Sequence, residues 1–568
     1  MKKKTLALAV CLSASMMAAL LMPVKTHAST KTSMKVTAGG DKISIKVSNA
    51  SESGKLYSFY ANNYPEEDSL KGLGAMSTGK LIGSINKGQT KTFTTERTTD
   101  SYDNLYKKYY LIGNDDDIIK GPVYATSIAS KSTKSLSQKN IKGLFVEDNT
   151  NNLSTAKSLG ASSVTLNIKL DRIMYKDESV APSDAITFDS NGQTYYFNKK
   201  TIDSYDNFVK TASDKKMNVI GIAIPFYTDD TNQYPSELRY NSPKSRTTLG
   251  TNTSNALGRD YYIAIMEFLA SRYSNSEHGY ISTYVIGNEI DFTHYFYATS
   301  NFNKYMEEYA RSLRLANLAV KKYWSKIDVA VPFTHYWAKS SGQMYKECPS
   351  ASFAPKKMVD WLVKQTKARG AYNWALAPHP YGVVNTRSAM TYGDSRAARN
   401  GKKALTGSYK TSPEITFTNL EVLDQYLGTS ALKYGGKKRK VYLTESGASS
   451  SNLSSKSLKE QAASVAYAYY KCANLSSIKS FNYYRLKDHP TEAANHLTCG
   501  LLKTNGKKKP AYTVYKNINK KKSAANKYLK YVKYKKNGSG KDIKAKSWSG
   551  AMNIYSNKFK FSWKKVIK

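Results

Sequence analysis

Two glutamates are the residues of this sequence that could most directly carry chemistry. Glu289 ends the stretch 284–289 and Glu445 lies within 441–447, and in both stretches an apolar, β-branched run meets polar residues at the glutamate. Each run is typical of a buried strand, so each carboxyl group is expected at a strand's carboxyl end, where parallel barrels and open α/β sheets build their sites. Two carboxyl groups can cleave a glycosidic bond, because one protonates the leaving oxygen while the other attacks the sugar or activates a water molecule.

The elements that must position these glutamates repeat along residues 140–520. Short apolar runs alternate with long helical patterns, and we count eight of each, the last helix being the one around 512–518. Eight β/α units predict a (β/α)8 TIM barrel, in which Glu289 follows the fourth strand, Glu445 follows the seventh, and both point into the same mouth. The expected strands are 143–146, 163–168, 218–224, 283–286, 328–331, 374–377, 440–443 and 480–484.

Helical stripes and loops fit this barrel. Residues 260–273 and 303–323 both place apolar and aromatic side chains on one helical face, and the excess length falls in two expected loops, 171–198 and 386–416. The alternative fold is a doubly wound sheet, but no glycine-rich phosphate loop follows the first strand, which weakens it.

The arrangement resembles the clan A glycoside hydrolases, whose acid/base follows an asparagine at the end of strand four and whose nucleophile ends strand seven. That resemblance implies that Glu289 is the acid/base, Glu445 is the nucleophile and Asn288 contacts the sugar 2-hydroxyl, in a retaining reaction. Within that superfamily, the chain also resembles an uncharacterised family of secreted bacterial proteins, through residues 287–291, 378–381, 484–485 with 488–490, and 500–502. In place of the tryptophan that many clan A members carry after strand eight, this chain has tyrosines and Arg485.

Further candidate substrate contacts follow other strands. His379 and Tyr381 come after strand six, beside the expected nucleophile, and a histidine or phenol there can bond a sugar hydroxyl or the carboxylate. Trp337 offers a face for stacking on a sugar ring. Arg485 and Asp488 either bind a polar or acidic sugar group or pair with each other. The remaining candidates are loop histidines, which either contact sugar or cap backbone groups: His294, His335 and His489.

Neither a cofactor nor a metal is expected. A metal site built from His335 and His379 has no supporting ligand spacing. The alternative for Glu289 and Glu445 themselves is that they are ordinary strand-end carboxylates, held by helix or lysine partners.

The regions before the barrel predict export and a small β domain. Residues 1–28 combine a lysine start, an apolar stretch and a small-residue exit, which is typical of a signal peptide, and no later run is long and apolar enough to cross a bilayer. Residues 29–128 show period-two alternation punctuated by turn residues, which predicts an antiparallel β-sandwich, and 129–139 is a Ser/Lys-rich linker. We therefore expect a secreted, extracellular or wall-associated protein.

The formal charge of the chain is +43, and the signal segment contributes four lysines to it. Such a field favours anionic partners such as cell-wall polymers, and without a nucleic-acid-binding motif we expect no specific nucleic acid. Residues 521–568 are lysine-rich with interleaved aromatics, and we expect them to pack on the barrel rather than to form a separate envelope-binding tail.

Three cysteines remain after the signal, without close spacing, so we expect isolated thiols, with a Cys472–Cys499 disulfide left open. The competing functions are a retaining glycoside hydrolase acting on a polysaccharide and a non-catalytic glycan-binding or adhesion protein of the cell envelope.

Overall fold

A computed structural model of the chain describes residues 32–60, 79–240, 248–292, 301–342, 344–345, 348–381, 407–450, 452–535, 542–552 and 559–567. The signal segment and most of the loop expected at 386–416 therefore lie outside the described residues. In the part of the chain that is described, no helix is long and apolar enough to span a membrane.

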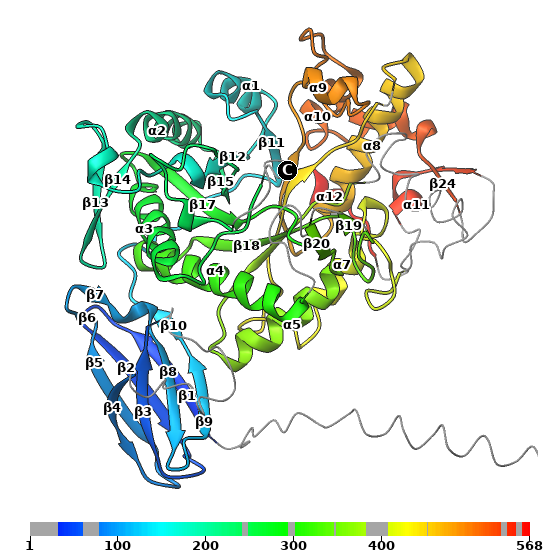
Figure 1. Ribbon diagram of the computed structural model, residues 1–568. Helices are drawn as coiled ribbons and strands as arrows, with labels where there is room; N and C mark the ends of the chain where they lie inside the picture. The colour runs from blue at the N-terminus through cyan, green and yellow to red at the C-terminus, as the bar shows by residue number, and fades with distance from the viewer. Residues whose placement is uncertain are drawn as a thin grey trace, which may run out of the picture.

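Two four-stranded sheets form the N-terminal region (Figure 1). One has the order β10 (Ala125–Ile128), β1 (Ser33–Ala38), β2 (Lys42–Ser48), β5 (Lys91–Glu96), and the other β4 (Lys80–Ile85), β3 (Gly54–Phe59), β8 (Lys108–Gly113), β9 (Ile118–Val123). The two sheets share one core, while Tyr57, Phe59, Tyr110 and Ile112 of β3 and β8 form a second, smaller cluster. Strands β1 and β2 alternate buried with exposed positions as the period-two pattern predicts. The pairings are antiparallel except that of β1 with β10, which is parallel.

Eight parallel strands close into a barrel, which confirms the predicted fold class. The order runs β15, β12, β11, β23, β22, β21, β18, β17, and a further pairing of β15 with β17 completes the circle. The strands are β11 (Lys142–Phe145), β12 (Ser163–Lys169), β15 (Asn218–Ile224), β17 (Gly279–Ile286), β18 (Asp328–Phe333), β21 (Ala375–Pro378), β22 (Val441–Ser446) and β23 (Ile478–Tyr483).

One main helix follows each strand and covers the barrel from outside (Figure 1). The helices are α1 (Leu153–Ser158), α2 (Lys199–Asp214), α3 (Ala256–Arg272), α4 (Phe302–Tyr323), α5 (Pro355–Ala368), α7 (Glu421–Leu427), α8 (Ser455–Ala473) and α10 (Pro510–Asn517). Helix α3 begins at Ala256, earlier than the predicted 260, because the Asn255 side chain accepts a hydrogen bond from the Gly258 amide and caps it there.

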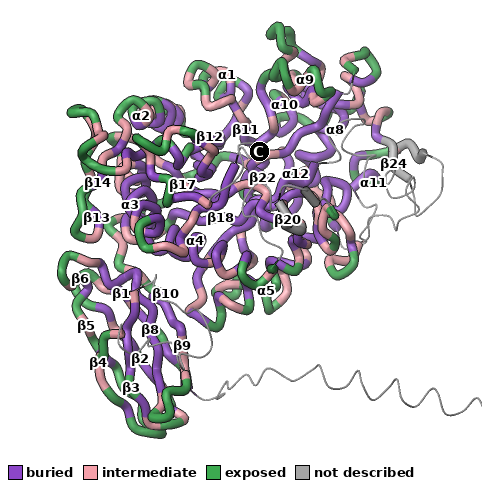
Figure 2. Tube along the Cα trace, in the orientation of Figure 1, coloured by how far each residue is buried: buried purple, intermediate pink, exposed green. Residues whose placement is uncertain are grey.

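Alternate residues of the barrel strands serve two separate cores. In β15, Ile220, Ile222 and Ile224 belong to the small cluster of the barrel interior, whereas Val219 and Ala223 belong to the large core beneath the helices. Because both faces are covered, the strands are buried nearly throughout (Figure 2). The charged side chains of these strands lie at or near the strand ends, and the candidate site is at one of these ends, whereas buried polar residues such as Ser163 and Asn482 bond to each other between the strands.

Segments outside the eight units pack on the barrel. The insertion after β12 contains a hairpin, β13 (Ile186–Ser190) with β14 (Gln193–Phe197), whose Phe197 stacks on Phe268 of α3. The Ser130 hydroxyl and the backbone amides of Lys131 and Ser132 donate to carbonyl oxygens in the last turn of α4. Near the C-terminus, α11 (Trp548–Met552) and α12 (Trp563–Val566) place their tryptophan rings against Tyr470 of α8. Cys472 and Cys499 are free, buried thiols.

Candidate active site

One histidine joins the two predicted glutamates. His379 Nδ1, just past β21, lies 2.9 Å from Glu289 Oε1 and 3.9 Å from Glu445 Oε2. The two oxygens can be no further apart than the sum of these distances. This upper limit on the separation of the two oxygens is close to the smallest carboxyl spacing of inverting glycosidases (~6.5–9.5 Å). The ~5 Å spacing of retaining glycosidases lies below it. The sequence-based expectation that strands four and seven bring their glutamates into one mouth therefore agrees with the geometry.

The turn after β17 aims Glu289. Its backbone φ is 44°, a left-handed conformation that a glutamate rarely adopts, and Gly287 before it has φ 85°. Asp291 stabilises the turn, because its carboxylate accepts hydrogen bonds from both the backbone amide (2.8 Å) and the hydroxyl of Thr334. Burial raises the pKa of Asp291 to about 7. Strained backbone of this kind persists where the surroundings fix it, and it is frequent at functional sites.

Tyr381 completes the contact with the second glutamate. Its hydroxyl donates to Glu445 Oε1 at 3.0 Å. Burial keeps the pKa of this phenol well above its usual value, so Tyr381 remains a donor. On the other side of the imidazole, Thr444 Oγ1 lies 3.4 Å from His379 Nε2, so both ring nitrogens face polar partners.

The electrostatics of the three groups are linked. Burial alone would lower the pKa of His379, but the charges of Glu445 and Glu289 and the hydrogen bond to Glu289 outweigh it, and the net direction is upward. Burial raises the pKa of Glu445; the charge of His379 and the hydrogen bond from Tyr381 oppose that shift, and the charge of Glu289 adds to it. The Glu289 and Glu445 side chains keep 20% and 32% of their surface exposed, so both can be reached from the mouth.

Arg485 and Asp488 have separate partners. Arg485 Nε donates to Glu147 Oε1 (3.1 Å), and its Nη1 donates to Glu492 Oε1 (2.9 Å) and to the hydroxyl of Tyr484 (2.9 Å). Asp488 is buried and forms an ion pair with Lys509 at 2.7 Å. The alternative that Arg485 and Asp488 pair with each other is thus not what the structure shows.

The other predicted contacts occupy different surroundings. Trp337 is only 3% exposed and donates its indole N–H to the Tyr409 carbonyl oxygen at 2.7 Å, so it serves the barrel wall. The His335 ring stacks on Tyr336, and His489 is exposed at the start of α9 (Pro490–Ala494). Asn288 is half-buried next to Glu289. His294 lies outside the described residues.

Some residues of the site were missed by the sequence analysis. Thr444 stands next to Glu445 and Asp291 two residues after Glu289, so proximity in sequence could have suggested both. Glu147 follows the first strand, as a strand-end carboxylate should. Glu492 lies in a short helix without a periodic pattern, and no local signal points to it. Among the residues described, no group of three or more His, Cys, Asp or Glu is arranged to hold a metal ion.

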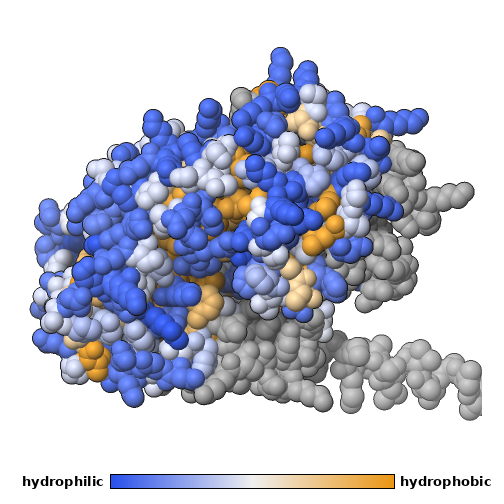
Figure 3. Space-filling model, turned by 90° about the horizontal axis from the view of Figure 1, so that it is seen from above, coloured by the Kyte–Doolittle hydropathy of each residue, from blue (hydrophilic) through white to orange (hydrophobic). Residues whose placement is uncertain are grey.

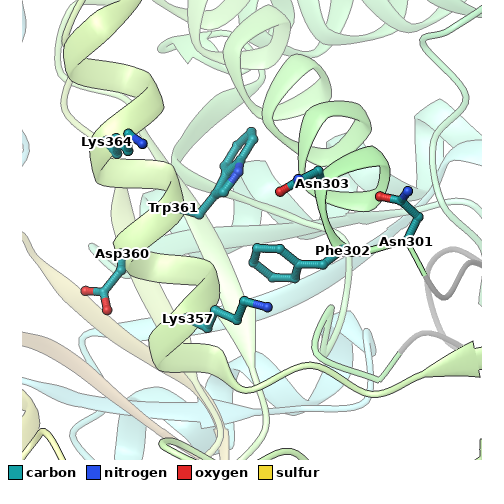
Figure 4. Close-up of a pocket in the computed structure, with 7 residues that line it drawn as sticks. All are labelled: Asn301, Phe302, Asn303, Lys357, Asp360, Trp361 and Lys364. Atoms are coloured by element: carbon teal, nitrogen blue, oxygen red, sulfur yellow. The ribbon is translucent and has the colours of Figure 1, made fainter. Parts of the chain in front are cut away.

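An open cavity lies on the outer surface, apart from these carboxylates. It has a volume of about 600 Å³ and lies between the start of α4 and α5 (Figure 4). Phe302 and Trp361 provide its aromatic rings, with Lys357 positioned over the Phe302 ring at 4.0 Å. The cavity contains none of the residues that surround His379, so its size does not identify it with the candidate site.

Comparison with known proteins gives a family and a set of barrel structures. A family model described as "Family of unknown function (DUF5722)" matches residues 134–536. No curated protein matches the chain.

Three solved structures illustrate the structural likeness. The first is a family 39 glycoside hydrolase from Bacteroides cellulosilyticus WH2, with 14% identity, TM-score 0.43, and 86% of this chain and 79% of that chain covered. The second, a Bacteroides uniformis beta-glucuronidase, has 11% identity and TM-score 0.38, with 86% of this chain and 50% of that chain covered. The third, GH5_18 from Streptomyces cattleya, has 10% identity and TM-score 0.42, with 67% and 80% covered. At such low identities and TM-scores these likenesses carry no argument about activity or substrate.

Proposed function

The chain belongs to the DUF5722 family, whose function is unknown, and we propose that it is a secreted retaining glycoside hydrolase that cleaves the O-glycosidic bonds of a polysaccharide. In this proposal Glu289 is the acid/base and Glu445 the nucleophile. The observation that carries it is the convergence of both carboxylates on one buried histidine at the carboxyl end of the barrel.

The geometry supports a two-step reaction. Glu289 gives its proton to the glycosidic oxygen while Glu445 attacks the anomeric carbon, so the bond to the leaving group breaks and a glycosyl-enzyme ester forms. Glu289, now ionised, then takes a proton from water, and the oxygen of that water displaces Glu445. In this scheme Asn288, which precedes Glu289 in the chain, contacts the 2-hydroxyl.

His379 and Tyr381 support the nucleophile in this scheme. Both favour the ionised form of Glu445, one by its positive charge and the other by its hydrogen bond. Because Glu289 approaches the same imidazole, the two carboxyl groups share one region of positive charge.

Export and attraction to the envelope are part of the proposal. The signal-like residues 1–28 support secretion, and the lysine excess supports retention at an anionic cell-wall polymer by attraction that salt weakens. The face in Figure 3 is largely hydrophilic, which suits a protein that meets water and polymer rather than lipid.

A panel of dyed polysaccharides tests the activity, and NMR of the first sugar released tests its stereochemistry. The expected result is turnover with retained anomeric configuration that is lost in Glu445→Ala and kept in Glu277→Ala, whose exposed carboxylate is a matched control. Turnover that survives Glu445→Ala, or product with inverted configuration, would contradict the proposal.

The charge of +43 favours a second candidate, a non-catalytic protein that binds glycans or wall polymers. It predicts retention on the polymer without turnover, equal in the wild type and Glu445→Ala, and lost as salt is raised.

A further inference from the structure

Arg485 lies beside the proposed nucleophile in the mouth of the barrel, and its positive charge is already paired with two carboxylates. Arg485 bonds to Glu147 on one side and to Glu492 and Tyr484 on the other. Its guanidinium also lies over the Phe145 and Tyr484 rings, at 5.3 and 5.0 Å, and these two rings stack on each other with centroids 5.0 Å apart. Each partner of Arg485 therefore fixes its position, and two of them neutralise it.

This cluster adjoins Glu445. The Tyr484 ring meets the Tyr381 ring edge-on at 6.5 Å, and Tyr381 donates to Glu445. The charge of Glu492 is among the causes that raise the pKa of Glu445, so the two carboxylates are close enough to interact. The residues come from the ends of β23 and β11 and from α9, which continue the mouth beyond β22.

Exposure decides which groups an arriving sugar would meet. The Arg485 side chain is 7% exposed, whereas the side chains of Glu147 and Glu492 are 24% and 27% exposed. The guanidinium is thus covered by its own partners, and the side chains that remain partly exposed are those of the two glutamates, with Glu492 Oε2 itself buried. Carboxylates accept hydrogen bonds and repel anions.

Among the residues that the structure describes, the other charged groups of this part of the mouth do not reverse that balance. Asp148, next to Glu147, adds a carboxylate that accepts from the amide and side chain of Asn167. Lys509 is buried in its ion pair with Asp488. Lys169, at the end of β12, is exposed, and its charge acts on Asp148 and Asp171.

We propose that the sugar residue bound beside Glu445 is uncharged or carries an amino group, and that uronic acids are rejected there. The inference rests on the proposed function and assigns its substrate class: a neutral polysaccharide, or one that contains free amino sugars. It also assigns Arg485 a positioning role, because the guanidinium orients two carboxylates and a phenol instead of binding an acidic substrate.

Equilibrium binding of matched monosaccharides tests this proposal. The probes are the hexose, the 2-amino-2-deoxyhexose and the hexuronic acid of the gluco, galacto and manno series, measured by saturation-transfer NMR on the full chain. Salt is held near 0.15 M, so that the general positive field is screened within about 8 Å. In at least one series, the neutral and amino sugars should bind at least about tenfold more tightly than the uronic acid, since an unpaired like charge costs that much or more.

Two variants distinguish the effect of this carboxylate cluster from the effect of the protein's overall charge. Glu492→Gln removes one neutralising partner of Arg485 and should strengthen uronic acid binding by at least about fivefold, since a charge-assisted hydrogen bond becomes available. Glu277→Gln removes the same charge from an exposed position, 80% accessible, and should leave uronic acid binding unchanged. Glu147→Gln tests the same point if Glu492→Gln does not fold.

The outcomes also distinguish this inference from the proposed function. Uronic acids that bind as tightly as the neutral sugars, equal effects of Glu492→Gln and Glu277→Gln, or no binding in any series would each overturn the inference. Hydrolysis of a polyuronide that depends on Glu445 would overturn it while leaving the hydrolase intact. A correct order of binding without turnover of any polysaccharide would instead count against the hydrolase alone.

Discussion

Carboxylates at the two ends of the barrel have different cationic partners. At the amino end, Asp328 Oδ2 accepts from Lys440 Nζ at 2.7 Å and from the Tyr442 hydroxyl at 2.6 Å, so one carboxylate has a full cation of its own. At the carboxyl end, Glu289 and Glu445 share one buried imidazole. The amino end is balanced and can serve stability. The mouth has an excess of negative charge, which a proton or the positive charge of an oxocarbenium-like transition state relieves.

Replacing Glu445 should give the largest effect on turnover. Glu445→Ala removes the attacking oxygen, and we expect kcat to fall by roughly 10⁴-fold or more, the scale of losing a nucleophile in other enzymes. Added azide should restore part of the turnover and give a glycosyl azide of inverted configuration, which NMR can identify. An azide-insensitive variant would place the nucleophile elsewhere.

Glu289→Gln comes next, because an amide cannot protonate the leaving oxygen. We expect kcat on the natural polysaccharide to fall by about 10²–10⁴-fold. Glycosides with a strongly acidic leaving group, such as dinitrophenol, need no such proton and should form the glycosyl-enzyme nearly as fast as with the wild type. Equal losses for both kinds of substrate in burst kinetics would argue against an acid/base role.

Tyr381→Phe should produce a smaller loss together with a change in pH dependence. The phenol stabilises ionised Glu445, so its removal raises the pKa of Glu445 further above the ordinary carboxyl range. Because the attack requires ionised Glu445, the acidic limb of the kcat/KM profile should move to higher pH, with a loss of about tenfold at neutral pH for one hydrogen bond to a charged group. An acidic limb at unchanged pH would show that the Tyr381 hydroxyl does not stabilise ionised Glu445.

Asp328→Asn should have the smallest effect on turnover, which makes it the control for the other end. It leaves Lys440, 40% exposed, to be solvated, so we expect a loss of about 1–3 kcal/mol in unfolding free energy and kcat within about twofold of the wild type. Denaturant unfolding and initial rates measure the two quantities. A large fall in kcat at unchanged stability would show that the two ends are not separate in role.

Much of the barrel could be predicted because its signal is local. Each of the eight strands is a largely apolar run, and most runs are followed closely by a polar residue, whereas β15 continues into Pro225 and Phe226. His379 and Tyr381 were expected beside the nucleophile for the same reason, since strand six adjoins strand seven.

The partners of Arg485 could not be predicted in this way. The Arg485–Glu147 contact joins residues 338 positions apart, and Glu492 reaches it from a loop helix. Trp337 could not be assigned for a similar reason. The local sequence around an aromatic residue just past a strand is the same whether the ring lines the mouth or packs into the wall. The structure places it in the wall because its N–H finds a backbone carbonyl oxygen there.

The buried ammonium of Lys471 has a practical consequence for anyone who shortens this chain. It pairs with Glu421 at 2.8 Å and donates to the Met552 carbonyl oxygen at 2.7 Å, with the Phe559 ring 4.5 Å away. A gene trimmed at residue 536, where the family match stops, would delete two of these three neighbours and expose the aromatic side of α8. Recombinant production should therefore retain residues 537–568, even where only the barrel domain is wanted.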